Sequence, residues 1–372
     1  MDLQLSDDQR ALRSGMRDLL GAVFDREALR AAVERGGAVD RGLWRELGAA
    51  GLFALRLPEE AGGVGLGLPE AVLLFEEAGR ALLPGPLVAT HLAAGAVEGA
   101  AEGEAVVTVA EGGGRPVAHL GEADAVLVRP GVRAGPGASA GSGGLTGLGV
   151  LTGEALAASV AEAGPVRSLD PLTPLHRAEG LAGAVTGLAG AATGLSGAAM
   201  ELARAAAGLA RGSEAYPGAF RDQGALLTAA EQLGSATRTT EMAGQHARAR
   251  EQFGAPIGSF QAVKHLCADM LARTEPARSA LYAAALTADP VEIAAAKLLA
   301  DEAAVRNARD CLQIHGGMGF TWEADVHLHL KRAWLRASRW LTAAEAEEML
   351  AAALGPSSGP VPPLYSGSAA SG

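Results

Sequence analysis

The sequence predicts a mainly α-helical protein with a small β domain in the middle of the chain. Apolar residues recur at helical spacing from residue 6 to about 100, and again from about 226 toward the C-terminal region. Between these regions, AVVTVAEG and ADAVLVRPG are short β-branched runs bounded by turn residues. The chain has 372 residues, of which 49% are hydrophobic and 20% charged, so it has globular composition and room for two or three domains.

The first region, residues 1–102, is assigned to an N-terminal helical domain. Ser6 followed three residues later by Gln9 is a capping-box signature at the start of a helix. A second helix is expected around residues 39–51, and a third begins at Pro69 and ends before Pro84-Gly85-Pro86. The stretch LRLPEEAGGVGLGLPE between them reads as a loop because Pro and Gly interrupt it.

Residues 103–185 are assigned to a reduced β domain, in which LTGLGVLTG is a third candidate strand. The segment GVRAGPGASAGSGG is of low complexity and predicts a mobile loop. Residues 186–222 are rich in both Ala and Gly and are assigned to a linker or insertion. Residues 223–352 have the pattern of a helical bundle of the four-helix type, and residues 353–372 have the composition of a disordered tail.

Charge and cysteine content exclude several classes of protein. The net charge is −11, so the surface repels phosphate backbones and anionic lipid, and we expect no nucleic-acid or membrane partner. The two cysteines, Cys267 and Cys311, form no disulfide framework and suit a reducing cytoplasm. The segment MDLQLSDDQR is acidic where a signal peptide is basic, and the uncharged stretch 181–200 has few large apolar side chains. A cytoplasmic location is expected.

Two segments of the C-terminal region carry a family resemblance. They are RAREQFGAPIGSFQAVKHLCADM at residues 248–270 and QIHGGMGF at residues 313–320. With LGAAGLFALRLPEEAGGVGLG and LLFEEAGRALLPGPL near the N-terminus, they make the chain similar to acyl-CoA dehydrogenases over residues 5–110 and 225–345. The details resemble the actinobacterial branch that acts on bulky acyl-CoA thioesters, including steroid side chains, often as two unlike subunits. An acyl-CoA dehydrogenase fold with a C-terminal bundle at the subunit interface is therefore expected.

The resemblance implies FAD as cofactor, with part of it bound by residues of a neighbouring subunit. Arg250 can give a guanidinium fork to the pyrophosphate, and Phe253 can pack against the adenosine end. Gln261 lies at the start of the next helix, where free backbone N–H groups favour anions. Glycines after Gln313 let the backbone approach a ligand closely. The positions matched to the family's FAD contacts are Arg250, Phe253, Gln261, Gln313, Gly316 and Gly317.

Each of these positions also has a purely structural interpretation. An Arg on a helix is most often a solvated charge, an isolated Phe is most often core, and glycines after Gln313 can be an ordinary helix stop. A metal interpretation of His315, His327 and His329 is disfavoured, because His327 and His329 would point to opposite sides of a helix and no carboxylate-rich segment completes the set. No metal site is expected.

The expected catalytic base is missing from its usual positions. The family abstracts a proton next to the thioester with a Glu placed either after the glycine motif or at the start of the long helix. Counted without gaps, these positions are Trp340 and Gly224, so no catalytic residue is assigned. The flavin-cradling segment of the middle domain has only Ala110–Gly114 as a counterpart. Other carboxylates near the two positions are Asp222, Glu231, Glu345, Glu347 and Glu348.

Three functions remain open at this point. The first is one subunit of a heterotetrameric, FAD-dependent acyl-CoA dehydrogenase, which binds FAD in trans while an unlike subunit supplies the base. Its substrate would be an acyl-CoA and its electron acceptor an electron-transfer flavoprotein or a similar protein. The second is a non-enzymatic structural or regulatory relative that binds no flavin. The third is a self-sufficient homo-oligomeric enzyme with a displaced carboxylate.

Overall fold

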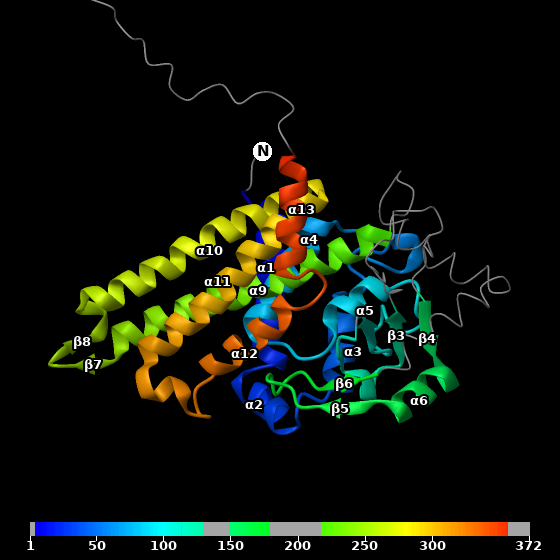
Figure 1. The fold of residues 1–372 in the computed structure, drawn as a ribbon, viewed down its shortest axis with the longest axis horizontal. Coiled ribbons are helices and arrows are strands. Elements are labelled where there is room, and N and C mark those ends of the chain that lie inside the picture. Colours follow the sequence, from blue (N-terminus) through cyan, green and yellow to red (C-terminus); the bar gives the residue numbers. More distant parts are fainter. Residues whose placement is uncertain (1–3, 113, 129–148, 179–216, 356–372) are drawn as a thin grey trace, which may run out of the picture.

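The computed structural model describes residues 4–112, 114–128, 149–178 and 217–355, and it has the predicted architecture. N-terminal helices and a C-terminal bundle enclose one large core, and the small β region lies beside them at one end of the bundle (Figure 1). The fold class predicted from the sequence is confirmed. Of the segments discussed above, GVRAGPGASAGSGG, residues 186–216 and the tail from residue 356 lie outside the described residues.

The N-terminal region is helical, as predicted. Ser6 accepts a hydrogen bond from the backbone N–H of Gln9 at 3.1 Å, and Gln9 returns one, so the capping box is present. Pro69 lies in the first turn of its helix, as expected. Two short helices had no predicted counterpart; one begins after Asp25, which caps it, and the other follows Gly85-Pro86. The helices are α1 (Asp7–Val23), α2 (Arg26–Glu34), α3 (Arg41–Ala49), α4 (Leu68–Ala81) and α5 (Leu87–Ala93), with a 3₁₀ turn at Glu59–Ala61.

The three predicted strands form one sheet in the order β1-β3-β4. They are β1 (Val107–Ala110), β3 (Ala125–Val128) and β4 (Gly149–Thr152); β1 and β3 are parallel, and β3 and β4 antiparallel. All residues of β1 and β3 are buried, and all but Thr108 are apolar. A second sheet has the order β2-β6-β5, and α6 lies beside β4. These elements are β2 (Val117–Ala118), a 3₁₀ turn at Leu120–Glu122, α6 (Gly153–Glu162), β5 (Gly164–Val166) and β6 (Leu175–Arg177).

The C-terminal bundle is built around the long helix α9 (Pro217–Ala249), which contacts α4, α10 and α11. A Cβ on Gly234 would lie 1.8 Å from the carbonyl oxygen of Glu76, so glycine is what lets α9 approach α4 so closely. Helix α9 begins before the boundary expected at residue 223; the other domain boundaries stay predictions. The remaining elements are β7 (Glu251–Gln252), β8 (Ala255–Pro256), η3 (Ile257–Ser259), α10 (Gln261–Thr287), α11 (Pro290–His315), η4 (Gly316–Phe320), α12 (Val326–Ala337) and α13 (Ala343–Leu354).

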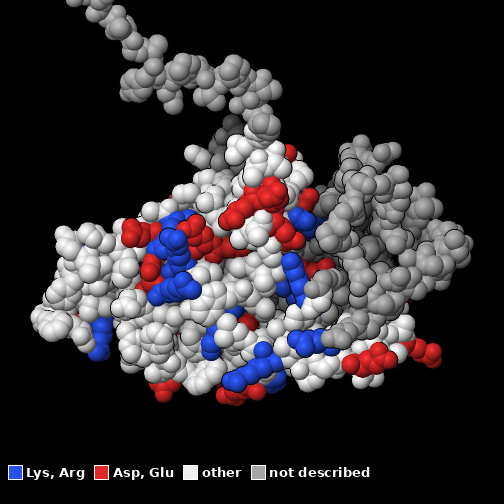
Figure 2. All heavy atoms as spheres, viewed as in Figure 1, with Lys and Arg blue, Asp and Glu red and all other residues white. Residues whose placement is uncertain are grey.

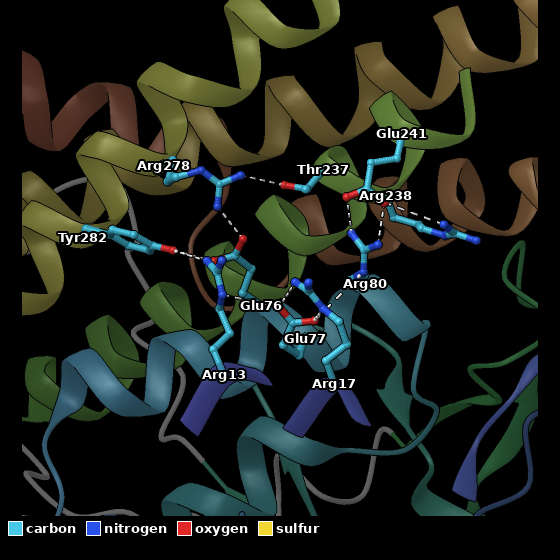
Figure 3. Close-up of polar contacts among 10 residues, drawn as sticks. All are labelled: Arg13, Arg17, Glu76, Glu77, Arg80, Thr237, Arg238, Glu241, Arg278 and Tyr282. Carbon is cyan, nitrogen blue, oxygen red and sulfur yellow. Dashed lines mark hydrogen bonds and ion pairs between the residues drawn. The ribbon is translucent and has the colours of Figure 1, made fainter. Parts of the chain in front are cut away.

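Buried ion pairs attach the N-terminal helices to the bundle (Figure 3). Two consecutive carboxylates of α4 point in different directions. Glu76 accepts hydrogen bonds from Arg278 and Tyr282 of α10, the latter at 2.8 Å. Glu77 is bound by Arg17 of α1 through two nitrogens, at 2.8 and 2.6 Å. Because both carboxylates are nearly inaccessible to solvent, removing a partner would leave an uncompensated buried charge.

On the face shown in Figure 2, acidic and basic side chains of the described residues are interleaved, and they form no continuous basic surface there. Within the described ranges, none of the helices has an apolar stretch that could cross a bilayer.

Candidate functional site

One end of the bundle brings together the residues that the sequence singled out. Helix α9 ends there, the β7–β8 hairpin turns back, α10 begins, and α11 ends in η4 (Figure 1). The rings of His246 and His315 stack with centroids 4.1 Å apart, which joins the end of α9 to the end of α11. Beneath them lies a small apolar cluster that includes Met270, Cys311 and Leu312. The six expected FAD contacts are therefore carried by segments that meet at one end of the bundle.

Phe253 occupies an unusual position in the hairpin. It has φ 53° and the next residue, Gly254, has φ 77°, so both central residues of the tight turn are left-handed. Left-handed backbone is unfavourable for a Phe, and the side chain is 92% exposed, with only an edge-to-face contact to Phe260 at 6.1 Å between centroids. A strained backbone that holds an aromatic ring in solvent fits a residue that contacts a ligand or another subunit.

Arg250 and Gln261 are both exposed, and neither side chain has a polar partner among the described residues. The Arg250 carbonyl accepts from the N–H of Ile257 at 2.8 Å, so its backbone is fixed while its guanidinium is free. Helix α10 begins at Gln261, as predicted, and no side chain caps its first turn. A free guanidinium and a helix N-terminus at the same end of the bundle suit a phosphate-bearing ligand.

Gln313, Gly316 and Gly317 are also exposed, whereas Gly319 is buried. Gln313 is exposed in the last turn of α11, and Gly316 ends that helix with φ 60° and ψ −141°, a conformation available essentially to glycine alone. A Cβ on Gly317 would meet nothing within 4 Å, so the chain itself does not require glycine there. The helix-stop interpretation therefore explains Gly316, and Gly317 stays a predicted ligand contact.

The two positions where the resemblance places the catalytic base lie against each other in the interior. A Cβ on Gly224 of α9 would fall 2.2 Å from the indole ring of Trp340. Trp340 is 4% exposed and packs edge-to-face on Phe220, with centroids 5.3 Å apart. Its backbone is left-handed, with φ 62°, and its N–H donates to Glu111 at 2.8 Å. The indole ring therefore fills the space next to Gly224.

The carboxylates near Trp340 are engaged elsewhere. Glu345 accepts from the Thr342 backbone and hydroxyl, both at 2.8 Å, as the cap of α13. Burial would raise the pKa of Glu345, but these hydrogen bonds lower it, so it is ionised at neutral pH. Asp222 lies 3.9 Å from Arg221 and is already partnered, and Glu347 and Glu348 are exposed. A cavity between the β region and the bundle is lined on one side by Trp340. Among its described lining residues Glu231 is the one carboxylate, and it is hydrogen-bonded to Arg336 at 2.7 Å.

Three arginines around the end of α12 bind carboxylates of three different segments, which sequence reasoning missed. Arg332 pairs with Asp170, which lies before β6, and Arg336 pairs with Glu231 of α9. Arg339 pairs with Glu111, directly after β1, at 2.5 Å. We call these pairs the arginine ladder. Their spacing of four and three residues, which puts them on one face of a helix with apolar neighbours, is the signal that could have revealed them.

The ladder closes the cleft between the β region and the bundle. Glu111 belongs to the segment Ala110–Gly114, the one expected counterpart of the flavin-cradling segment. Its carboxylate forms an ion pair with Arg339 and accepts hydrogen bonds from the backbone N–H of Trp340 and, at 3.2 Å, from Arg115. These contacts join the end of β1 to the turn after α12.

The histidines do not gather into a metal site. His315 hydrogen-bonds through Nδ1 to the Cys311 carbonyl at 2.8 Å, and His329 contacts the Ser235 hydroxyl at 2.8 Å. His327 packs edge-to-face on Trp322. Within the part of the chain that the structure describes, no three His, Cys, Asp or Glu side chains come together as metal ligands.

Two models of one protein family match most of the chain. The family model "Acyl-CoA dehydrogenase, N-terminal domain" matches residues 6–103, and "Acyl-CoA dehydrogenase, C-terminal domain" matches residues 210–345. The chain is 33% identical to acyl-CoA dehydrogenase IpdE2 of Mycobacterium tuberculosis over 88% of its own length and 91% of that relative.

Two further proteins are similar to this chain over most of its length. The chain is 33% identical to acyl-CoA dehydrogenase FadE34 of Mycobacterium tuberculosis, over 88% of this chain but 45% of FadE34. Its fold is similar to that of a chain in the ChsE4-ChsE5 complex of the same organism, with a TM-score of 0.70 and 22% identity over 97% of this chain and 100% of that one.

Proposed function

Since this chain belongs to the acyl-CoA dehydrogenase family, we propose that it is one subunit of a heteromeric, FAD-dependent acyl-CoA dehydrogenase. In this assembly it contributes the outer FAD contacts to a site shared with an unlike subunit. The unlike subunit supplies the catalytic base and the pocket for the acyl-CoA. The bound flavin supplies the hydride acceptor of the reaction, and this chain's residues hold its far end.

The geometry at the end of the bundle supports the FAD assignment. Arg250 is a free guanidinium for the pyrophosphate, and the exposed ring of Phe253 suits the adenosine end. Gln261 presents an amide beside a helix N-terminus, and Gln313 and Gly317 are accessible on the neighbouring segment. An exposed set of this kind requires a neighbouring molecule to complete it, which fits cofactor binding across a subunit interface.

The surface around these residues supports the same interface. Met318, Phe320 and Trp322 are 60, 77 and 62% exposed in and directly after η4. In Figure 2 the bundle end with the hairpin is mostly uncharged. A group of large exposed apolar side chains on one end of a molecule is typical of a surface buried by another subunit.

The single observation that supports placing the catalytic base on the unlike subunit is the contact between Trp340 and Gly224. The two positions where the family places its base are Gly224 and Trp340, and neither residue can accept a proton. The indole ring of Trp340 lies directly against Gly224. The remaining carboxylate of the cavity wall, Glu231, is bound to a guanidinium. These contacts support the proposal that a carboxylate of another chain removes the α-proton.

The relatives support the kind of assembly. ChsE4-ChsE5 is a complex of two differently named chains, and more than half of FadE34 lies outside its match to this chain, which leaves room for a second unit of similar length. A heterotetramer with a second acyl-CoA dehydrogenase subunit, a bulky or steroid-type acyl-CoA substrate and an electron-transfer flavoprotein as acceptor follow from the family resemblance.

The test is to purify the chain alone and together with an unlike acyl-CoA dehydrogenase subunit from the same source, and to record flavin absorbance and acyl-CoA turnover. The proposal predicts little flavin and no turnover alone, and both in the complex. Absence of flavin at this interface in every complex would favour the structural or regulatory alternative, which the closed cleft behind the arginine ladder also fits. Flavin and turnover in the isolated chain would identify a displaced carboxylate.

A further inference from the structure

The segment 316–325 carries part of the proposed FAD site and has few hydrogen bonds of its own. It consists of η4 and the loop that leads into α12. The N–H of Thr321 donates to the Met318 carbonyl at 3.1 Å, and the N–H of Ala324 donates to the Thr321 carbonyl at 3.2 Å. A Cβ on Gly317 would meet no atom within 4 Å, so the packing is loose there. Such a segment keeps one conformation only if other elements hold it.

Helix α2 holds the far end of this segment through two arginines. Arg26 donates from Nε to the Asp325 carboxylate at 2.6 Å and from Nη2 to the Glu323 carbonyl at 2.7 Å. Arg30 donates to the Trp322 carbonyl and forms an ion pair with Asp325 at 2.5 Å. The side chains of Arg30 and Asp325 are 22 and 17% exposed, so this pair is better shielded than an ordinary surface pair. In Figure 1, α2 lies beside the loop that enters α12.

The Asp325 carboxylate serves this connection rather than its own helix. Asp325 is at the N-cap position of α12, where an Asp side chain normally accepts from backbone N–H groups of the first turn, but it caps none of them. Asp25, at the N-cap of α2, does accept from the N–H of Ala28 at 2.9 Å. The contrast favours a role for the contact with α2 beyond the stability of α12.

Both ends of the segment are anchored to well-packed parts of the molecule. Leu29 and Ala32 of α2 are buried in the large core, and the two arginines, four residues apart, lie together on one face of the same helix. At the other end of the segment, the stacked rings of His246 and His315 join it to α9. An N-terminal helix thus fixes a loop that follows it by almost 300 residues, since Arg26 and Asp325 are 299 positions apart.

We propose that Arg26 and Arg30 are positioning residues for the shared FAD site. By holding the far end of segment 316–325, they keep Gly317 and the exposed Met318 where the unlike subunit and its FAD meet this chain. This inference rests on the proposed function. A segment that is ordered before binding loses little conformational entropy when FAD binds, so release of the far end should weaken FAD binding.

The test is titration of FAD into the flavin-free complex of this chain with its unlike subunit, at a temperature where circular dichroism shows each variant folded. Arg26→Gln and Arg30→Gln should each weaken FAD binding roughly twofold to thirtyfold, the range typical of residues that act on a site without touching its ligand. Arg30→Lys keeps the charge and three N–H donors, and should restore part of the affinity. Arg35→Gln, the same change at the end of α2 in a pair with Asp40, is the matched control and should leave FAD binding unchanged.

Hydrogen exchange of the isolated chain tests the connection without FAD or a partner. In Arg26→Gln and Arg30→Gln, the backbone amides of residues 316–325 should exchange faster than in wild type. Amides in the middle of α9 and α11 should exchange as in wild type. A role in folding alone would instead lower protection throughout the bundle and leave the FAD affinity of the folded complex unchanged.

Three results would overturn the inference. If both arginine variants bind FAD as wild type does while Arg250→Ala binds it more weakly, positioning by α2 is wrong and the proposed function stands. If Arg250→Ala also binds FAD normally, the proposed function fails, and the inference fails with it. If exchange accelerates across the whole bundle and not selectively in residues 316–325, the two arginines act only in folding.

Discussion

Trp340 is a buried aromatic residue in the interior of the chain. Its ring fills the space next to Gly224, and its left-handed backbone is held by the hydrogen bond to Glu111. On the other side, Gly224 is required because any side chain there would enter the ring. Gly224 and Trp340 are therefore matched in shape.

This contact predicts a strong effect of Gly224→Ala. The new methyl would lie 2.2 Å from the buried indole, and relief requires displacement of α9 or of the ring. We expect a loss of about 1–3 kcal/mol in the free energy of unfolding, measured by urea denaturation. Gly244→Ala, on the same helix with only the tip of Arg248 at 3.8 Å, is the control and should be neutral or stabilising by up to about 1 kcal/mol. Equal behaviour of the two variants would show that Gly224 and Trp340 are not in contact.

At the exposed end, Arg250→Ala should reduce FAD retention in the assembled complex far more than it reduces stability. Loss of a charged contact to pyrophosphate costs about 1.5–3 kcal/mol, which is roughly one to two decades in affinity. Flavin content after gel filtration measures it. Arg45→Ala, an exposed change on α3, is the control. Full flavin content in a folded Arg250→Ala complex would remove Arg250 from the FAD site.

At the level of the elements, α12 and the turn after it form ion pairs with three other segments. Through the arginine ladder one helix, with the turn after it, binds the segment before β6, the helix α9 and the end of β1. The β region is small and its second sheet has strands of two or three residues, so it gains much of its attachment from these pairs.

The buried pair of Arg332 and Asp170 predicts that Asp170→Asn lowers the free energy of unfolding in a pH-dependent way. Burial would raise the pKa of Asp170, but the charge of Arg332 and hydrogen bonds from Thr173 and Leu172 bring it below its usual value. A carboxylate with a lowered folded-state pKa stabilises the fold above its unfolded pKa of about 3.9, and this stabilisation is lost as the pH falls through the folded value. Asp170→Asn leaves Arg332 buried without a counterion, and should cost about 3–5 kcal/mol at neutral pH.

The measurement is urea denaturation of both proteins across pH. The difference between them should shrink below about pH 4, where wild type begins to lose the same charge. Asp7→Asn, in a surface pair with Arg10, is the control and should change little at any pH. A difference that stays constant down to the acid transition would mean that Asp170 is not ionised in the fold.

The sequence predicted elements where local patterns were strong. Ser6 and Gln9 located the start of α1, Gln261 the start of α10, and the β-branched runs the strands β1, β3 and β4. It did not reveal β5 and β6, because GPV and LHR are too short to show alternation, nor α2 and α5. The spacing of the arginines in the ladder was a local signal, but their partners were not predictable. A partner such as Asp170 is distant in the sequence, and no local pattern identifies it.

At the level of the whole molecule, the proposal gives the chain two unlike halves of a cofactor site. The outer half is complete in residue type and open to a neighbour at the end of the bundle. The inner half is filled by Trp340 and the arginine ladder. The central claim is therefore that this chain shares a flavin with an unlike subunit and does not house one of its own.

The most direct measurement is the ratio of FAD to polypeptide in the purified complex of the two unlike subunits, with flavin released by denaturation and each chain quantified separately. The account predicts one FAD for every two chains, half the number expected if each chain had its own site. One FAD per chain in the complex, or turnover by this chain alone that disappears on Glu345→Gln, would contradict it.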